Sequence, residues 1–107
     1  MPYRIVLAPE AVEDLRRLPA NVRAEVRDAI KRYLRHRPEA VSKARIKKLR
    51  GLLRPQYRLR MGEVRVFYDV IEDRVEILAI VRKEDAAAWL REVGRSNEAG
   101  SSTPGEG

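Results

Sequence analysis

Arginines recur in this chain at the two-residue spacing that places side chains on one face of a β-strand. Arg58, Arg60 and Arg65 fall in segments that alternate apolar and charged residues, and Arg82 follows an apolar segment further along the chain. Arginine suits phosphate because its planar guanidinium donates paired hydrogen bonds and keeps its charge in proteins. Held together on one surface, such a group could bind a polyanion such as RNA.

A hairpin is predicted to bring these arginines together. Residues 57–61 and 64–70 each have the two-residue period of a half-buried strand. Gly62 and Glu63 between them fit a type II′ turn, with glycine in the first central position. The resulting cross-strand pairs are Met61 with Val64, Arg60 with Arg65, and Arg58 with Phe67.

A third strand over residues 75–81 should follow a turn at Glu72 and Asp73. Simple alternation then sets Phe67 opposite Leu78 and Arg65 opposite Ile80, with Arg82 just beyond that row. Directly opposed residues share a face, so one face carries Arg58, Arg60, Arg65 and Arg82 around Phe67, Leu78 and Ile80. The other face is the predicted core: Tyr57, Leu59, Met61, Val64, Val66, Tyr68, Ile77, Ala79 and Val81.

Like charges directly opposite each other on a sheet are unfavourable by roughly 0.2–1 kcal/mol. A bound anion would reverse the sign of that contribution. The alternative interpretation is that the arginines are simply exposed and lie over Phe67 and Leu78 through their alkyl stems.

The overall charge agrees with an anionic partner. The chain of 107 residues has 23 Lys and Arg against 16 Asp and Glu, a net charge of +7. Residues 43–65 hold nine cations and one carboxylate, Glu63. This balance favours nucleic acid or an acidic protein as partner, although a solvated basic surface would have the same composition.

Several classes of function are excluded or disfavoured. The chain has no cysteine, so it has no disulfide framework, no thiolate nucleophile and no cysteine-containing zinc site. The N-terminal apolar run is too short for a signal peptide, and no later stretch approaches membrane-spanning length. We therefore expect a cytoplasmic protein. We also expect no metal and no cofactor.

The other elements predict one small α+β domain. Residues 3–8 read as a first strand, residues 10–18 as a helix ended by Pro19, and a second helix follows Asn21 as N-cap, with Pro38 closing it. A last helix should span residues 84–93, giving the order βααβββα. Residues 1–94 form the predicted domain, in which a small antiparallel sheet packs on the N-terminal helix hairpin. Residues 95–107 have almost no apolar side chains and are predicted to be a disordered tail.

These elements resemble a known family. The order βααβββα, KKLRG at residues 47–51, YRLRMGEVRVFYDV at 57–70 and VEILAIVRK at 75–83 together are similar to the RelE/ParE toxins of type II toxin-antitoxin pairs. The resemblance implies a compact toxin neutralised by an antitoxin encoded beside it, in a hetero-oligomer. In the RelE branch the activity is metal-independent cleavage of mRNA on the ribosome; in the ParE branch it is inhibition of DNA gyrase.

The resemblance also implies roles for residues. Arg58 and Arg60 match two basic positions where RelE-type enzymes often have lysine, and Arg65 matches their arginine on the next strand. Arg82 or Lys83 stands near their basic position after the last strand. Four further cations are expected to contact RNA backbone phosphates as positioning groups: Lys47, Lys48, Arg50 and Arg54.

One departure from the family concerns proton transfer. RelE-type nucleases tend to carry a tyrosine or histidine in the last segment, where this chain has EDAAAWL with Trp89. Arginine cannot serve as a base, so Lys83, Glu63 or Glu84 would have to do so. Trp89 itself is either a core anchor for the last helix or a platform for a base.

Three functional hypotheses follow. The first is a RelE-like endoribonuclease that cleaves mRNA on the ribosome and inhibits translation. The second is a non-catalytic ParE-like inhibitor of gyrase, and the third is a degenerate toxin that only binds its antitoxin. The arginine cluster favours the first hypothesis, and the missing tyrosine favours the other two.

Overall fold

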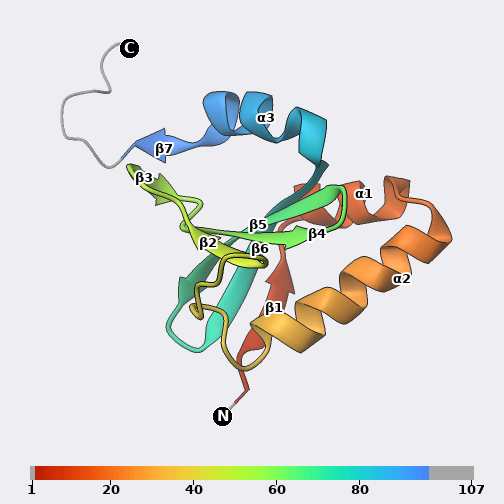
Figure 1. Ribbon diagram of the computed structural model, residues 1–107, viewed down its shortest axis with the longest axis horizontal. Helices are drawn as coiled ribbons and strands as arrows, with labels where there is room; N and C mark the ends of the chain where they lie inside the picture. The colour runs from red at the N-terminus through yellow and green to blue at the C-terminus, as the bar shows by residue number, and fades with distance from the viewer. Residues whose placement is uncertain (1, 97–107) are drawn as a thin grey trace.

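The computed structural model describes residues 2–96, which form a five-stranded sheet with helices around it (Figure 1). The strand order is β1-β6-β5-β4-β2, with β1 parallel to β6 and the other neighbours antiparallel. The strands are β1 (Arg4–Leu7), β2 (Ile46–Lys48), β4 (Tyr57–Met61), β5 (Val64–Ile71) and β6 (Arg74–Arg82). The predicted α+β class is confirmed.

A helix hairpin covers one face of this sheet. It consists of α1 (Pro9–Arg17) and α2 (Ala20–Ala29), and α2 continues as one π-helical turn, Ile30–Leu34. Pro9 opens α1, where its missing N–H costs nothing, and the cations of the last turn suit the negative end of the helix. The prediction that Asn21 caps α2 is wrong: Pro19 precedes the helix, and Asn21 lies inside it.

The core lies between the hairpin and the sheet. Ala11, Val26 and Leu34 from the helical side have essentially no exposed surface. Their partners on the sheet are buried too: Leu59, Val66, Tyr68, Val75 and Ile77. Tyr68 is the largest of these, and its hydroxyl donates a 2.6 Å hydrogen bond to the carbonyl of Pro38, which ties the segment after α2 to the sheet. We call this side the helix face.

A β-bulge between β5 and β6 corrects the predicted pairing. Tyr68 pairs with Ile77 but Phe67 pairs with Ala79, so Leu78 is an extra residue without a partner. Alternation along β6 is therefore shifted by one residue from that point on. Ile80, predicted beside the arginines, is 3% exposed in the core, and Ala79 and Val81 pair with Phe67 and Arg65 on the opposite face.

Three short strands were not predicted: β2, β3 (Leu52–Arg54) and β7 (Arg95–Ser96). They are two or three residues long and lack an alternating pattern. β3 pairs with β7 in a separate two-stranded sheet, so the described fold extends two residues beyond the predicted domain end. The rest of the predicted tail, residues 97–107, lies outside the described residues.

The last helix is α3 (Ala86–Val93), preceded by a 3-10 turn, Lys83–Asp85. Figure 1 shows α3 apart from the α1–α2 hairpin, beside β3 and β7. It has no fully buried residue. Within residues 2–96, no helix has the length and apolar character needed to cross a membrane.

Candidate functional site

The sheet face opposite the hairpin holds three arginines, which we call the arginine row: Arg58 and Arg60 on β4, and Arg65 on β5. Arg60 pairs with Arg65, and Arg58 pairs with Phe67, as the hairpin pattern predicted. The turn that fixes this register has Gly62 at φ +58°, which a type II′ turn requires at its first central position.

Arg65 is a buried cation, with 7% of its surface exposed. Its Nη1 donates to the carbonyl oxygens of Gly62, at 2.8 Å, and Val64, at 3.1 Å. Among residues 2–96, no carboxylate lies within ion-pair distance of it. Burying a charge without a counter-ion is costly, so this guanidinium is positioned where an anion would compensate it.

Arg58 adds a second uncompensated group. It is half-buried, and its Nε is a buried donor with no hydrogen-bond partner in the described structure. Burial lowers the pKa of Arg58, and the neighbouring charges of Arg65 and Arg60 lower it further. These charge contributions indicate that the three guanidinium groups act on one another. A phosphate bound at the row would reverse this repulsion.

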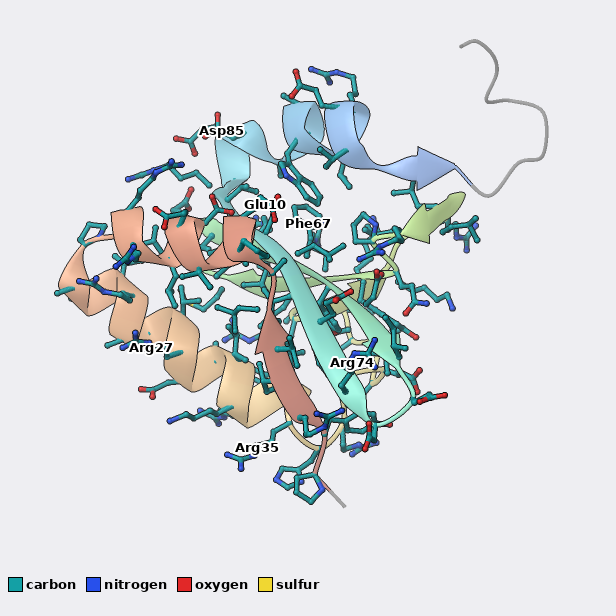
Figure 2. The ribbon with its side chains drawn as sticks, turned by 180° about the vertical axis from the view of Figure 1, so that it is seen from behind. Glu10, Arg27, Arg35, Phe67, Arg74 and Asp85 are labelled. Carbon is teal, nitrogen blue, oxygen red and sulfur yellow. The ribbon has the colours of Figure 1, made fainter. Side chains whose placement is uncertain are left out.

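An aromatic pair adjoins the row. The rings of Phe67 and Trp89 stack with centroids 4.8 Å apart and planes 17° from parallel. Phe67 has no exposed surface, and Figure 2 shows it on the sheet beneath α3. The interpretation of Trp89 as an anchor for the last helix is therefore correct, although α3 packs on the arginine side of the sheet.

Arg82 does not join the row. Because of the bulge, it pairs with Val64 and lies on the helix-face side of the sheet. Lys83 begins the 3-10 turn, and its backbone N–H donates to the carbonyl of Glu63 at 2.8 Å. Lys83 therefore stands at the hairpin turn, next to the end of the row.

The cations expected to position RNA lie in different places in the structure. Lys47 pairs with Arg58 across β2 and β4, so it extends the row by one strand. Lys48 lies on the other side of β2, with its Nζ 5.5 Å from the centre of the Tyr57 ring. Arg50 is exposed in the turn after β2.

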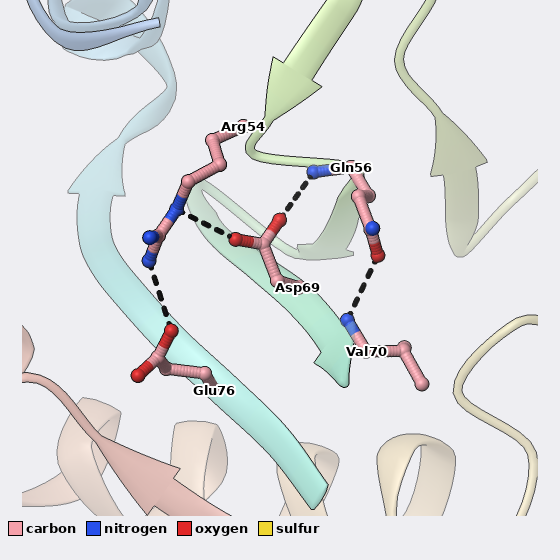
Figure 3. A network of polar contacts seen from close by, with 5 residues as sticks. All are labelled: Arg54, Gln56, Asp69, Val70 and Glu76. Atoms are coloured by element: carbon pink, nitrogen blue, oxygen red, sulfur yellow. Dashed lines mark hydrogen bonds and ion pairs between the residues drawn. The ribbon is translucent and has the colours of Figure 1, made fainter. Parts of the chain in front are cut away.

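Arg54 is engaged in a structural network instead (Figure 3). Its Nε lies 2.9 Å from Oδ2 of Asp69, and its Nη2 lies 2.9 Å from Oε1 of Glu76. Asp69 is 2% exposed, and it also accepts the backbone N–H of Gln56 at 2.7 Å. Burial raises the pKa of Asp69, against the opposing effects of the Gln56 N–H and the Arg54 charge. The charge of Arg54 is thus already compensated.

Sequence reasoning missed this carboxylate pair. Its signal was present, because Asp69 is the one acidic residue inside an otherwise apolar and cationic strand. A carboxylate in that position needs a partner. Glu76 pairs with Asp69 across β5 and β6, and Arg54 bridges the two.

The arginine row has cations but few proton-transfer groups. His36, the single histidine, is exposed just beyond the π-helical turn, and the carbonyl of the adjacent Arg35 accepts the N–H of Tyr3 before β1. The candidates at the end of the row are Lys83, Glu63 and Glu84, all exposed. Within residues 2–96 no cluster of acidic, histidine or cysteine side chains could hold a metal ion.

Comparisons with known proteins agree on one group. A family model described as the ParE toxin of the type II toxin-antitoxin system parDE matches residues 5–87. The RelBE2 toxin-antitoxin complex from Mycobacterium tuberculosis contains a chain of the same fold, with 27% identity and a TM-score of 0.66, over 77% of this chain and 92% of that one.

Two archaeal complexes are also similar. For the RelE-RelB complex from Pyrococcus horikoshii, the identity is 28% and the TM-score 0.58, over 78% of this chain and 97% of the other. For the RelB-RelE complex from Methanococcus jannaschii, which has 21% identity and a TM-score of 0.60 over 78% and 96%, the similarity shows the fold alone. A search of curated proteins gave no match.

Proposed function

We propose an activity on the premise that this chain belongs to the ParE toxin family of type II toxin-antitoxin systems, as the family model over residues 5–87 shows. It is a toxin of the RelE/ParE superfamily. The proposed activity is that of the RelE branch: a metal-independent endoribonuclease that cleaves mRNA on the ribosome and so inhibits translation in the cytoplasm. The solved relatives at 27% and 28% identity are complexes named for RelE toxins, which supports this branch.

The observation that carries the proposal is Arg65. It is 7% exposed, lacks a carboxylate partner among residues 2–96, and lies directly opposite Arg60. A fold does not retain a buried charge of this kind for stability, because an apolar residue would pack there at lower cost. A pentavalent phosphorane carries more negative charge than the phosphate diester from which it forms. Preorganised cations stabilise that charge as it develops.

The proposed reaction uses the RNA's own 2′-hydroxyl as nucleophile. Its oxygen attacks the adjacent phosphorus, the bond to the 5′-oxygen breaks, and the products are a 2′,3′-cyclic phosphate and a 5′-hydroxyl. One proton leaves the 2′-hydroxyl and one reaches the 5′-oxygen. Arg58, Arg60 and Arg65 would stabilise the phosphorane, while Lys83, Glu63 or Glu84 would transfer the protons at the end of the row.

The proposed roles of the other cations follow from their places. Lys47, Lys48 and Arg50 would contact the RNA backbone, whereas Arg54 would not, because it is paired with carboxylates. Arg82 would not contact the reacting phosphate, because it lies on the helix-face side of the sheet. The partners would be mRNA and the ribosome, and an antitoxin would hold the toxin in a hetero-oligomer, as the solved relatives are toxin-antitoxin complexes.

A second candidate is inhibition of DNA gyrase without catalysis. The name of the matching family model favours it, as does the absence of histidine or tyrosine beside the row in the described structure. A degenerate toxin that only binds its antitoxin is the third candidate.

Induced expression with mapping of mRNA 5′ ends, beside an assay of plasmid supercoiling, separates the candidates. Our proposal expects cuts within translated frames that leave 5′-hydroxyl ends, with supercoiling unchanged. Gyrase-linked DNA damage with intact transcripts would replace it with the second candidate. Neither effect, in cells that produce folded toxin without antitoxin, would indicate the third.

A further inference from the structure

A basic hollow lies over β2, the turn after it and β3, beside the arginine row. Its volume is about 710 Å³. Three cations line it, Lys47, Lys48 and Arg50, and none of its lining residues is acidic. The other lining residues are mostly apolar: Val41, Leu49, Leu52 and Leu53, with Gly51 and Gln56. We call this the β2–β3 hollow.

The cations of this hollow are available to a ligand. All three are exposed, and none of the ion pairs formed within residues 2–96 includes them. Lys47 lies on the arginine-row side of β2, whereas Lys48 lies on the helix-face side, where its ammonium contacts the ring of Tyr57. Arg54, at the end of the neighbouring strand, is the contrast, because both Asp69 and Glu76 compensate its charge. The hollow therefore attracts anions, whereas the surface at Arg54 does not.

The apolar wall is also unusually accessible. Leu53 is 60% exposed and Val41 is 61% exposed, although both are large hydrophobic residues. Grooves that bind single-stranded nucleic acid combine cations for the backbone with aromatic side chains on which the bases stack. In this hollow, aliphatic side chains stand in place of the aromatic ones. Aliphatic side chains can contact the face of any base, so such a wall would tolerate different sequences.

The hollow is continuous with the arginine row. Lys47 lines the hollow and pairs directly with Arg58 across β2 and β4. Neighbouring strands are about 4.8 Å apart, so one strand of RNA could run from the row over β4 and reach the hollow. Lys47 is the cation that the row and the hollow share, and Lys48 is reached around β2, which is the edge strand of the sheet.

We propose that the β2–β3 hollow is a second subsite for the RNA strand, which holds the phosphate and base of a nucleotide outside the scissile pair. This inference rests on the proposed function. It assigns Lys48 and Arg50 to backbone binding away from the reacting phosphate, and Leu53 to contact with a base.

The test compares RNAs of two lengths with the antitoxin-free full chain. The probes are a dinucleotide and an oligonucleotide of about eight nucleotides, both 2′-O-methylated so that they cannot be cleaved. The test variant is Lys48→Ala with Arg50→Ala. The control, Arg27→Ala with Lys31→Ala, removes the same charge from exposed positions of the helix hairpin.

For the longer probe, the test variant should bind about tenfold more weakly and lose about 1.4 from its salt slope, as expected for two lost contacts to a single strand. Dinucleotide binding and the control variant should match wild type. A further variant, Leu53→Ser, should weaken binding of the longer probe without changing the salt slope.

Three results would overturn the subsite. One is an unchanged affinity of the test variant for the longer probe. RNA would then bind at the row without using the hollow, so the subsite would fail while the proposed function stands. Another is an equal loss in the control variant, because the effect would then be one of net charge. A third is loss of antitoxin affinity with unchanged RNA affinity, which would make the hollow a protein-binding surface. If wild type binds neither probe, the proposed function fails together with the subsite.

Discussion

At the scale of single residues, two arginines of this chain have opposite environments. Arg65 is buried beside other cations, whereas Arg54 bridges two carboxylates. Both were candidate site residues from the sequence, Arg65 because of its position in a predicted strand and Arg54 because it lies in the basic segment 43–65. What distinguishes them is the position of Asp69 and Glu76, which depends on pairing between β5 and β6. The candidate site could thus be found from the sequence. The sequence could not show that Arg54 is paired with carboxylates and therefore does not belong to the site.

The environment of Arg54 gives a prediction with a pH dependence. Because burial raises the pKa of Asp69 in the folded state, protonation of Asp69 favours the fold, and this contribution is lost as the pH rises through the folded pKa. The positive charge of Arg54 stabilises the ionised form of Asp69 and not the protonated form, so Arg54 contributes to stability only when Asp69 is ionised. We therefore expect Arg54→Ala to cost about 1–2 kcal/mol near pH 7, after allowance for the half-exposed guanidinium, and less near pH 4, where a larger fraction of Asp69 is protonated.

Urea unfolding at the two pH values measures this difference. Arg16→Ala is the matched control, because Arg16 pairs with Glu13 at 3.1 Å on an exposed surface, and it should cost about 0.5 kcal/mol or less. An Arg54→Ala cost that is the same at both pH values would show that the ion pair with Asp69 does not contribute.

At the scale of elements, long segments with a clear hydrophobic period were predictable and short ones were not. The helices and the β4–β5 pairing followed from their periods, because a one-residue slip would have moved every core side chain to solvent. β2 and β3 are held by pairing with distant strands rather than by any local pattern. The bulge at Leu78 was not predicted either, because strict alternation along β6 leaves no place for an extra residue.

One side-chain contact stabilises the strand beyond this bulge. β1 pairs with β6 only as far as Ile77, and the N–H of Ile80 instead donates to Oδ2 of Asp14 in α1 at 2.9 Å. Asp14→Ala should cost about 1–2 kcal/mol, because it leaves a part-buried donor without an acceptor. Asp14→Asn retains an acceptor oxygen and should recover most of that stability.

Thermal unfolding of the two variants, with Glu13→Ala as a neighbouring control on the exposed surface, measures the contribution. Equal stability of Asp14→Ala and Glu13→Ala would mean that water replaces the carboxylate without cost. The hydrogen bond would then have no part in holding α1 against β6.

At the scale of the whole molecule, the net charge of +7 predicts how an antitoxin recognises this toxin. We expect the antitoxin to lay an acidic segment over the basic surface, so that long-range attraction speeds the encounter. The association rate should fall by about tenfold or more between low salt and about 1 M salt, where the screening length is only about 3 Å. Stopped-flow mixing across this range measures it. A rate independent of salt, or an antitoxin whose binding region is net basic, would contradict the prediction.

The central claim is that the arginine row cleaves RNA, and the most direct measurement is mRNA cleavage by Arg65→Met. Methionine keeps the apolar stem of the side chain but removes the charge and the hydrogen bonds to Gly62 and Val64. Circular dichroism would first establish that the variant is folded. Arg16→Met, on the exposed surface of α1, is the control.

We predict that Arg65→Met loses toxicity and cuts mRNA about 10²–10³-fold more slowly, the usual effect of losing one donor to a transition-state oxyanion, while Arg16→Met behaves as wild type. A folded Arg65→Met protein that still cuts transcripts at the wild-type rate would contradict the account. In that case the arginine row would not be the active surface.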